Sequence, residues 1–241
     1  MKHKPSHDTQ FFFATAPLPC PYLPDRVERR VVTELLGRDS VILHDQLSLA
    51  GFRRSHGIVY APACPNCQAC KATRILVREF TPSRSHRRIL NRNRNLRFDE
   101  VAVIATSEQF KLFSKYQNSR HAGGDMAHMD FHDYQALIEE TPVDTRLTEF
   151  RDIKKRLVAV CLADRLERGL SAVYSFFDPD LRRRSLGNFM ILQLVNEANR
   201  LDLDHVYLGF WIDGCSKMSY KARFQPIEMK TPEGWRRYVP D

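Results

Sequence analysis

Leu157-Val-Ala-Val-Cys-Leu162 and Leu170-Ser-Ala-Val-Tyr-Ser-Phe-Phe177 are two apolar stretches with the length and residue types of buried strands. The residues between them, Asp164–Gly169, are typical of a turn, so the pair predicts a β-hairpin. The longer stretch is far shorter than the roughly 20 residues of a membrane-spanning helix. We therefore expect a globular protein with no membrane partner.

Helices are predicted on both sides of this hairpin. Phe110, Phe113 and Tyr116 recur at helical spacing within 107–119, and Asp130 is suited to cap a second helix over 130–140. After the hairpin, we expect helices over 188–198 and 216–223 that alternate with strands at 205–212 and 225–229. The second half therefore predicts an α+β fold.

The N-terminal half has a different pattern. The proline-rich segment 16–24 must be extended, and a helix over 25–36 capped by Asp25 is expected to follow. Strands at 57–60 and 73–77 are predicted to form a hairpin around a cysteine-rich loop, and 101–104 reads as one more strand. We expect a small α+β domain over 1–105 that contains the cysteines and a larger domain over 106–241.

The element order of 106–241 resembles the acyltransferase fold of the GCN5-related N-acetyltransferases. In that fold the helix after the hairpin presents its free N–H groups to an anionic donor. Arg184-Ser-Leu-Gly187 precedes this helix and matches half of the family's pyrophosphate-binding loop, while Asn188 stands where a further glycine belongs. The incomplete loop argues against a CoA-dependent acetyltransferase.

No nucleotide-binding motif redirects this interpretation. Gly209–Gly214 has the glycine spacing of a phosphate loop, but Cys215 occupies the position that requires lysine. The chain also contains no G-x-G-x-x-G motif. We expect chemistry that uses an already activated donor.

Charge favours a polyanionic partner. The 241 residues are 43% hydrophobic, carry a formal net charge of +8 and have a pI near 9.3. Between Phe80 and Phe98 no acidic residue offsets the six arginines Arg84, Arg87, Arg88, Arg92, Arg94 and Arg97. A solvated helix face normally mixes signs, so we predict nucleic-acid phosphate contacts here and add Arg184 to this set.

The cysteines form the most specific local pattern. Cys64-Pro-Asn-Cys67-Gln-Ala-Cys70 has the spacing that lets a turn direct three thiolates at one metal, and Cys20 is a candidate fourth ligand. A structural zinc or iron–sulfur cluster is one interpretation, and reduced thiols in a polar loop are the other. The N-terminal residues show no export signal, so we expect a cytoplasmic protein with reduced cysteines.

Several segments together resemble one known family over essentially the whole chain, the bacterial aminoacyl-tRNA–protein transferases that are related to eukaryotic arginyltransferases. The segments are Gly51-Phe-Arg-Arg-Ser55, Tyr60–Cys70, Tyr116-Gln-Asn-Ser-Arg-His121, Gly169–Pro179, Ser185-Leu-Gly187, Tyr207–Ile212 and Lys217-Met-Ser-Tyr-Lys-Ala-Arg-Phe224. The triple-cysteine form is similar to the bacterial branch.

The resemblance implies leucyl transfer from leucyl-tRNA to the α-amino group of proteins that begin with Asp or Glu, a step of the N-degron pathway of protein degradation. Arginyl transfer to the same acceptors and a non-catalytic, metal-containing nucleic-acid-binding module are the alternatives. The aminoacyl ester is already activated, so no cofactor is needed for the chemistry. The sequence specifies no oligomeric state.

The reaction requires proton transfer, oxyanion stabilisation and a cation for the acceptor carboxylate. For the first two we predict Glu149 and Asp178 as acids and Tyr174 and Tyr207 as donors or relays, with a buried core role as the alternative for the tyrosines. For the acceptor we predict Arg120 with support from Lys217 and Lys221, or tRNA contact by the two lysines.

Overall fold

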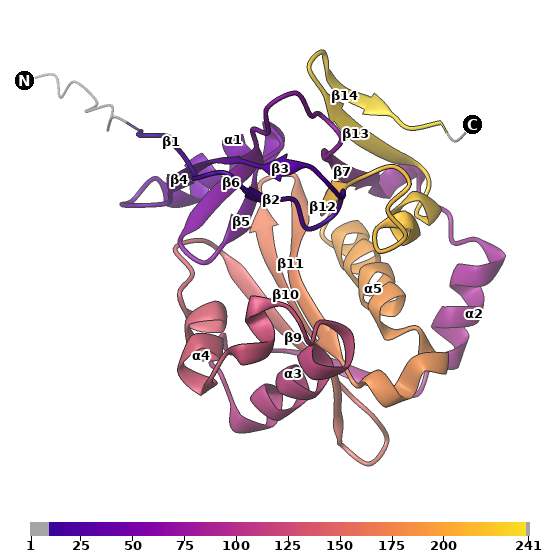
Figure 1. Ribbon diagram of the computed structural model, residues 1–241. Helices are drawn as coiled ribbons and strands as arrows, with labels where there is room; N and C mark the ends of the chain where they lie inside the picture. Colours follow the sequence, from indigo (N-terminus) through magenta and orange to yellow (C-terminus); the bar gives the residue numbers. More distant parts are fainter. Residues whose placement is uncertain (1–9, 240–241) are drawn as a thin grey trace, which may run out of the picture.

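The computed structural model describes residues 10–239 and is built around one eight-stranded sheet (Figure 1). Its strand order is β14-β13-β7-β12-β11-β10-β9-β8. The bounds are β7 Lys71–Leu76, β8 Arg97–Val101, β9 Thr145–Arg151, β10 Leu157–Leu166, β11 Gly169–Phe177, β12 His205–Trp211, β13 Ile227–Thr231 and β14 Gly234–Arg237. All neighbouring strands are antiparallel except β11 and β12.

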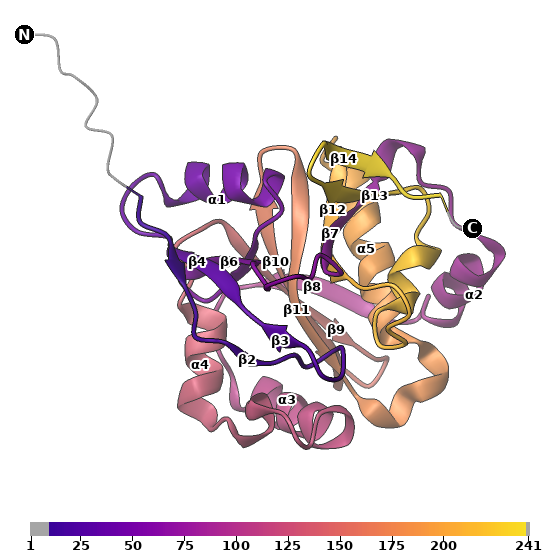
Figure 2. The ribbon, with the colours of Figure 1, turned by 45° about the horizontal axis from the view of Figure 1, so that its top comes forward.

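Helices cover both faces of this sheet and bury a separate core on each. The helices and short 3₁₀ turns of this part are η1 Val77–Glu79, α2 Arg84–Arg92, α3 Ser107–Arg120, η2 Asp125–His128, α4 Phe131–Glu139, η3 Pro179–Arg184, α5 Leu186–Arg200 and η4 Ser219–Arg223. α5 packs with Ile75, Phe150 and Val206 on one face, whereas α3 and α4 pack with Leu147 and Phe176 on the other. Figure 2 shows the two groups of helices on opposite sides of the strands.

A second, four-stranded sheet lies beside β11 and has the order β1-β4-β6-β5. Its elements are β1 Phe13–Ala14, β4 Arg30–Glu34, β5 Arg53–Ser55 and β6 Ile58–Pro62, with the helix α1 Ser40–Leu49 between β4 and β5. β2 Leu18–Pro19 and β3 Val27–Glu28 form a separate two-stranded ribbon. This sheet delivers β5 to the central sheet, which matters for the site below.

Most predicted elements of the second half are confirmed. The hairpin is β10–β11, and the helices expected near 107–119, 130–140 and 188–198 are α3, α4 and α5. Asp130 caps α4 because its side chain accepts the amide N–H of Asp133. β9 and β14 were not expected from the sequence, and the helix expected over 216–223 is the short 3₁₀ turn η4.

Two predictions for the N-terminal half are wrong, and the strand expected at 101–104 lies earlier in the chain, at β8. The helix expected over 25–36 is β3 and β4, because the β-branched run Val31-Val-Thr33 pairs with β6, and Asp25 has a positive φ of 56° instead of capping. The strands around the cysteine loop are not a hairpin, because β6 belongs to the four-stranded sheet and β7 inserts between β12 and β13.

The central sheet takes two strands, β7 and β8, from the part of the chain before residue 105. The division into 1–105 and 106–241 therefore stays a prediction about domains and does not coincide with a sheet boundary. Within the described residues, no helix is long and apolar enough to cross a membrane.

Candidate active site

β11 and β12 diverge soon after they begin, and this divergence creates the central feature of the site. They pair only where Gly169–Ser171 meets His205–Tyr207, although β11 continues to Phe177 and β12 to Trp211. We call the space between Val173–Tyr174 and Gly209–Phe210 the β11–β12 wedge. Backbone groups on its two sides lack each other as partners, so a side chain or ligand must enter.

Arg53 of β5 enters the wedge. Its Nη2 donates a 2.6 Å hydrogen bond to the carbonyl oxygen of Val173 on β11. On the other side, a Cβ added to Gly209 would lie 3.0 Å from Nη1 and 3.2 Å from Cδ of Arg53. Gly209 has a φ of +72°, so glycine provides both the backbone conformation and the room for the guanidinium.

A second cation, Lys221 of η4, lies beside Arg53. Its side chain is 5% exposed, and the ammonium donates to the carbonyl oxygen of Phe210. Burial, followed by the charge of Arg53, lowers the pKa of Lys221 to about 7. Lys221 is therefore buried at the wedge, and its predicted role in acceptor binding stays a prediction.

Three tyrosines lie near Arg53, and one of them, Tyr220, also lies beside Lys221. Burial raises the pKa of Tyr22, Tyr174 and Tyr220, and the nearby positive charge of Arg53 offsets part of this rise. The hydroxyl of Tyr174 accepts a 2.7 Å hydrogen bond from Nε2 of the buried Gln117. Tyr174 therefore has a fixed hydroxyl next to the wedge.

A group of polar and aromatic side chains lies farther along β11, around Phe177. The guanidinium of Arg120 stacks over Phe177 at 5.8 Å, and Tyr116 contacts the same ring with centroids 5.0 Å apart. Burial, followed by the charges of Lys217 and Arg120, lowers the pKa of His121, so both charges act on this imidazole. The predicted acceptor-binding role of Arg120 and Lys217 stays a prediction.

The start of α5 lies against this group of side chains around Phe177. A Cβ on Gly187 would lie 3.3 Å from the Phe177 ring, so the first turn of α5 approaches β11 closely. Ser185 precedes the helix with a φ of 54° and makes no side-chain cap. The first amide N–H groups of α5 therefore have no capping side chain and suit an anionic group.

The predicted phosphate-binding arginines lie on or next to α2 and η3, apart from Arg97, which begins β8. Those of α2 and Arg94 are exposed, and α2 packs against α5 at the right of Figure 1. Arg92 donates to the carbonyl of Arg183, and Nδ2 of Asn93 donates to that of Arg184 at 2.8 Å. We name the surface made by Arg84, Arg87, Arg88, Arg92, Arg94 and Arg182–Arg184 the basic face.

The four predicted metal ligands, Cys20, Cys64, Cys67 and Cys70, line one pocket next to Tyr60 and Phe210. Burial and then the neighbouring thiols raise the pKa of Cys70 to about 11. Four thiols fit zinc or an iron–sulfur cluster in kind. Nevertheless, no group of three or more Cys, His, Asp or Glu side chains in residues 10–239 already has metal-binding geometry.

Comparison with known proteins decides the family. The model described as "Arginine-tRNA-protein transferase, N terminus" matches residues 18–88, and the one described as "Arginine-tRNA-protein transferase, C terminus" matches residues 108–231. The chain belongs to the arginine-tRNA-protein transferase family. Its relatives include proteins named "Aspartate/glutamate leucyltransferase" from Paramagnetospirillum magneticum and Rhodospirillum rubrum, which are 56% and 52% identical over 100% and 98% of this chain and 98% and 96% of their own.

Solved structures confirm the acyltransferase-like fold of this transferase. FemX superposes with a TM-score of 0.53 at 8% identity, covering 82% of this chain and 68% of that one. L-PGS from Bacillus licheniformis gives 0.52 at 11% identity, with coverages of 86% and 66%. At these identities the likeness concerns the fold alone.

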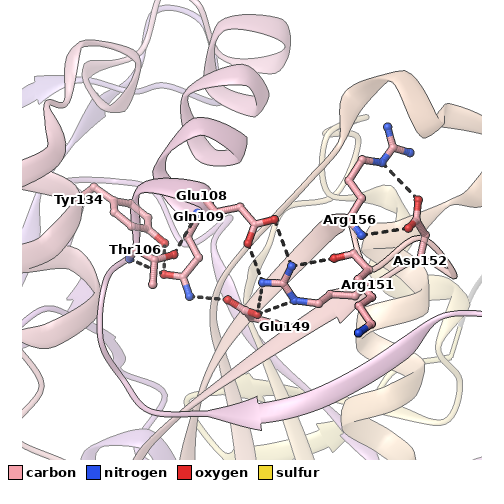
Figure 3. A network of polar contacts seen from close by, with 9 residues as sticks. Thr106, Glu108, Gln109, Tyr134, Glu149, Arg151, Asp152 and Arg156 are labelled. Carbon is pink, nitrogen blue, oxygen red and sulfur yellow. Dashed lines mark hydrogen bonds and ion pairs between the residues drawn. The ribbon is translucent and has the colours of Figure 1, made fainter.

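The structure does not bring the four predicted catalytic side chains of the transferase together. Glu149 lies on β9 within the network of Figure 3, where it accepts from Gln109 at 2.8 Å and from Arg151 at 2.7 Å. Arg151 in turn pairs with Glu108 at 2.7 Å. These contacts join β9 to α3.

Asp178 and Tyr207 also make their contacts with residues other than Tyr174. Asp178 is 4% exposed, caps η3 and accepts from Lys115 at 2.7 Å. Tyr207 accepts from Nη1 of Arg74 at 3.2 Å and packs against Trp235, with centroids 5.7 Å apart. Of the four, only Tyr174 lies beside the wedge.

Sequence reasoning missed Arg53, Arg54 and Asn93. Arg53 and Arg54 stand in the family segment Gly51–Ser55. Side chains alternate along a strand, so these two adjacent arginines point to opposite faces of β5, and this alternation could have indicated different roles for them. Arg54 forms a buried ion pair with Asp164, and Asn93 bonds to a distant loop. Such contacts between distant residues leave no local pattern in the sequence.

Proposed function

We propose that this chain transfers leucine from leucyl-tRNA to the α-amino group of proteins that begin with Asp or Glu, in the N-degron pathway and in the cytoplasm. The observation that carries the proposal is the 56% identity to an "Aspartate/glutamate leucyltransferase" over 240 residues, which include the wedge, the basic face and the cysteine loop. The geometry supports it in three ways.

The first support is electrostatic. tRNA is a polyanion, and the exposed arginines of the basic face match a row of phosphates. The face continues through Arg182–Arg184 to the start of α5, whose uncapped N–H groups lie next to Phe177. We assign tRNA binding to this face, including Arg84, Arg87, Arg88, Arg92, Arg94 and Arg184.

The second support is chemical. The neutral α-amine attacks the carbonyl carbon of the leucyl ester, so a C–N bond forms and the carbonyl oxygen becomes an oxyanion. The C–O bond to the ribose then breaks, and the proton lost by the amine ends on the ribose oxygen. The ester supplies the driving force, so the residues only position both substrates and move one proton.

The third support is the arrangement of donors at the wedge. We assign the oxyanion or proton relay to Tyr174, because Gln117 fixes its hydroxyl and Arg53 lies near. Arg120 and Lys217 are assigned to the acceptor chain, because they gather with His121 near Phe177. We propose no catalytic role for Glu149, Asp178 or Tyr207.

A structural metal completes the proposal. Cys20, Cys64, Cys67 and Cys70 would hold zinc or an iron–sulfur cluster and thereby join the β2–β3 ribbon to the loop after β6. A site closed by four protein ligands has no open position for substrate, so the metal would stabilise the fold.

The test offers purified protein leucyl-, arginyl- and phenylalanyl-tRNA with peptides that begin with Asp, Glu, Lys or Ala. We expect leucine in the Asp and Glu peptides without ATP. Transfer of arginine instead would show the arginyl alternative. If no charged tRNA served as donor, or if acetyl-CoA did, the proposed function would be wrong.

A further inference from the structure

Arg53 and Lys221 place a guanidinium and a buried amine at the wedge without a carboxylate partner. Among residues 10–239, no carboxylate lies within ion-pair distance of either side chain. Their only hydrogen bonds there go to the backbone carbonyls of Val173 and Phe210. Arg53 is half-buried and Lys221 is buried. Two adjacent basic groups with reduced hydration repel each other when both are protonated, and an anion between them removes this cost.

Two arginines near Arg53 differ from it because each has a carboxylate partner. Arg54, the next residue of β5, points away and has a fully buried carboxylate partner, Asp164, at 2.6 Å. Arg30 of β4 also has a partner, Glu28, at 2.7 Å. Arg54 and Arg30 are thus neutralised by carboxylates of the protein, whereas Arg53 remains available for a ligand.

We propose that Arg53, with Lys221 beside it, binds the side-chain carboxylate of the acceptor's N-terminal Asp or Glu. This inference rests on the proposed function and names the group that selects its acceptor. A guanidinium offers parallel N–H donors that match a carboxylate, and Val173 occupies only one nitrogen, Nη2. Arg53 is therefore a specificity residue.

The position of Arg53 favours the acceptor over the tRNA as its ligand. Arg53 reaches the wedge from β5 of the four-stranded sheet, whereas most arginines of the basic face lie on or next to α2, which packs against α5 (Figure 1). The two anions would therefore approach from different sides. The carboxylate of an N-terminal Asp lies close to its own α-amine, so binding in the wedge would hold that amine near Tyr174.

The test compares two peptides that differ only in their first residue, Asp or Asn, with radiolabelled leucyl-tRNA as donor. We expect the wild type to favour Asp in kcat/KM by about 100-fold, as for a buried charge pair. Arg53→Gln should reduce this ratio to about 1–3 by lowering the rate on Asp alone, at unchanged tRNA affinity. Arg53→Lys should restore a preference for Asp.

Two further measurements separate this role from a structural one. Arg30→Gln is the matched control, because it removes an equal charge nearby from a side chain that already has a partner, and it should keep the Asp:Asn ratio. The unfolding midpoint of Arg53→Gln without substrate should equal or exceed that of the wild type, because the mutation relieves repulsion with Lys221.

Three outcomes would overturn the inference. A wild-type Asp:Asn ratio in folded Arg53→Gln would do so and leave the proposed function intact. Loss of tRNA affinity with an unchanged ratio would assign Arg53 to a tRNA phosphate instead. Absence of leucine transfer by the wild type to either peptide would remove both proposals.

Discussion

Arg54 and Asp164 form a two-bond ion pair inside the protein. Nε and Nη2 of Arg54 donate to the two carboxylate oxygens at 2.6 and 2.7 Å, and the side chains are 1% and 0% exposed. The pair joins β5 to β10 and therefore fixes the strand that delivers Arg53 to the wedge. His44 lies 3.5 Å from the same carboxylate.

Breaking this pair should destabilise the protein strongly. Asp164→Asn leaves the Arg54 charge buried without a counter-charge, so we expect a loss of about 3–5 kcal/mol in the free energy of unfolding, measured by urea denaturation. Combining Arg54→Met with Asp164→Leu should cost far less than the sum of the single changes. Strict additivity of the two would show that the pair does not act as a unit.

The basic face should control the salt dependence of tRNA binding. Reversing Arg84, Arg88 and Arg94 to Glu should weaken binding and lower the slope of log affinity against log salt by about 0.7–0.9 per lost phosphate contact. Arg236→Glu, on β14, is the control and should leave the slope unchanged. An unaltered slope in the triple variant would place the tRNA elsewhere.

Asn93 should hold the end of α2 against the end of η3 and so position the start of α5. It is 1% exposed, and its Nδ2 donates to the carbonyls of Ile89 and Arg184 at 2.9 and 2.8 Å. Asn93→Ala should lower kcat for leucine transfer several-fold while the Kd for tRNA stays within about twofold, since no phosphate contact is removed. Asn95→Ala removes only an exposed bond to Arg184 and is the control.

The cysteine pocket should contain a metal in protein purified without oxygen. Elemental analysis should find zinc or iron, and Cys64→Ser with Cys67→Ser should remove it and lower the melting temperature. Cys161→Ala is the control, because Cys161 is buried in β10 and lies outside this pocket. Neither zinc nor iron in the wild type would contradict the prediction.

Stability should fall as the pH decreases from about 6.5 to 4. Burial lowers the pKa of His44, and burial and the Arg74 charge lower the pKa of His205 to about 4, whereas an unfolded histidine titrates near 6.5. The unfolded chain thus binds more protons in this range, so acid favours unfolding. Urea midpoints at pH 7.5 and 5 measure this, and His205→Gln should reduce the difference.

The sequence by itself determined the elements of the second half and the chemical character of the site. Hydrophobic periodicity identified α3, α5 and the β10–β11 hairpin because each buries a continuous apolar face, and the unbalanced arginines of α2 indicated a polyanion. It also identified the family through motifs spread along the chain, and the family comparison confirmed this.

Only the tertiary structure decided which polar residues meet. The insertion of β7 between β12 and β13, the burial of Lys221 and the entry of Arg53 between diverging strands all depend on pairings between distant residues. A local pattern records whether a residue faces a core, because burial has the period of its own helix or strand. It does not record which distant partner lies opposite. The sequence therefore indicated a catalytic role for Glu149 and none for Arg53, and only the assembled sheet placed Glu149 in an ion-pair network and Arg53 in the wedge.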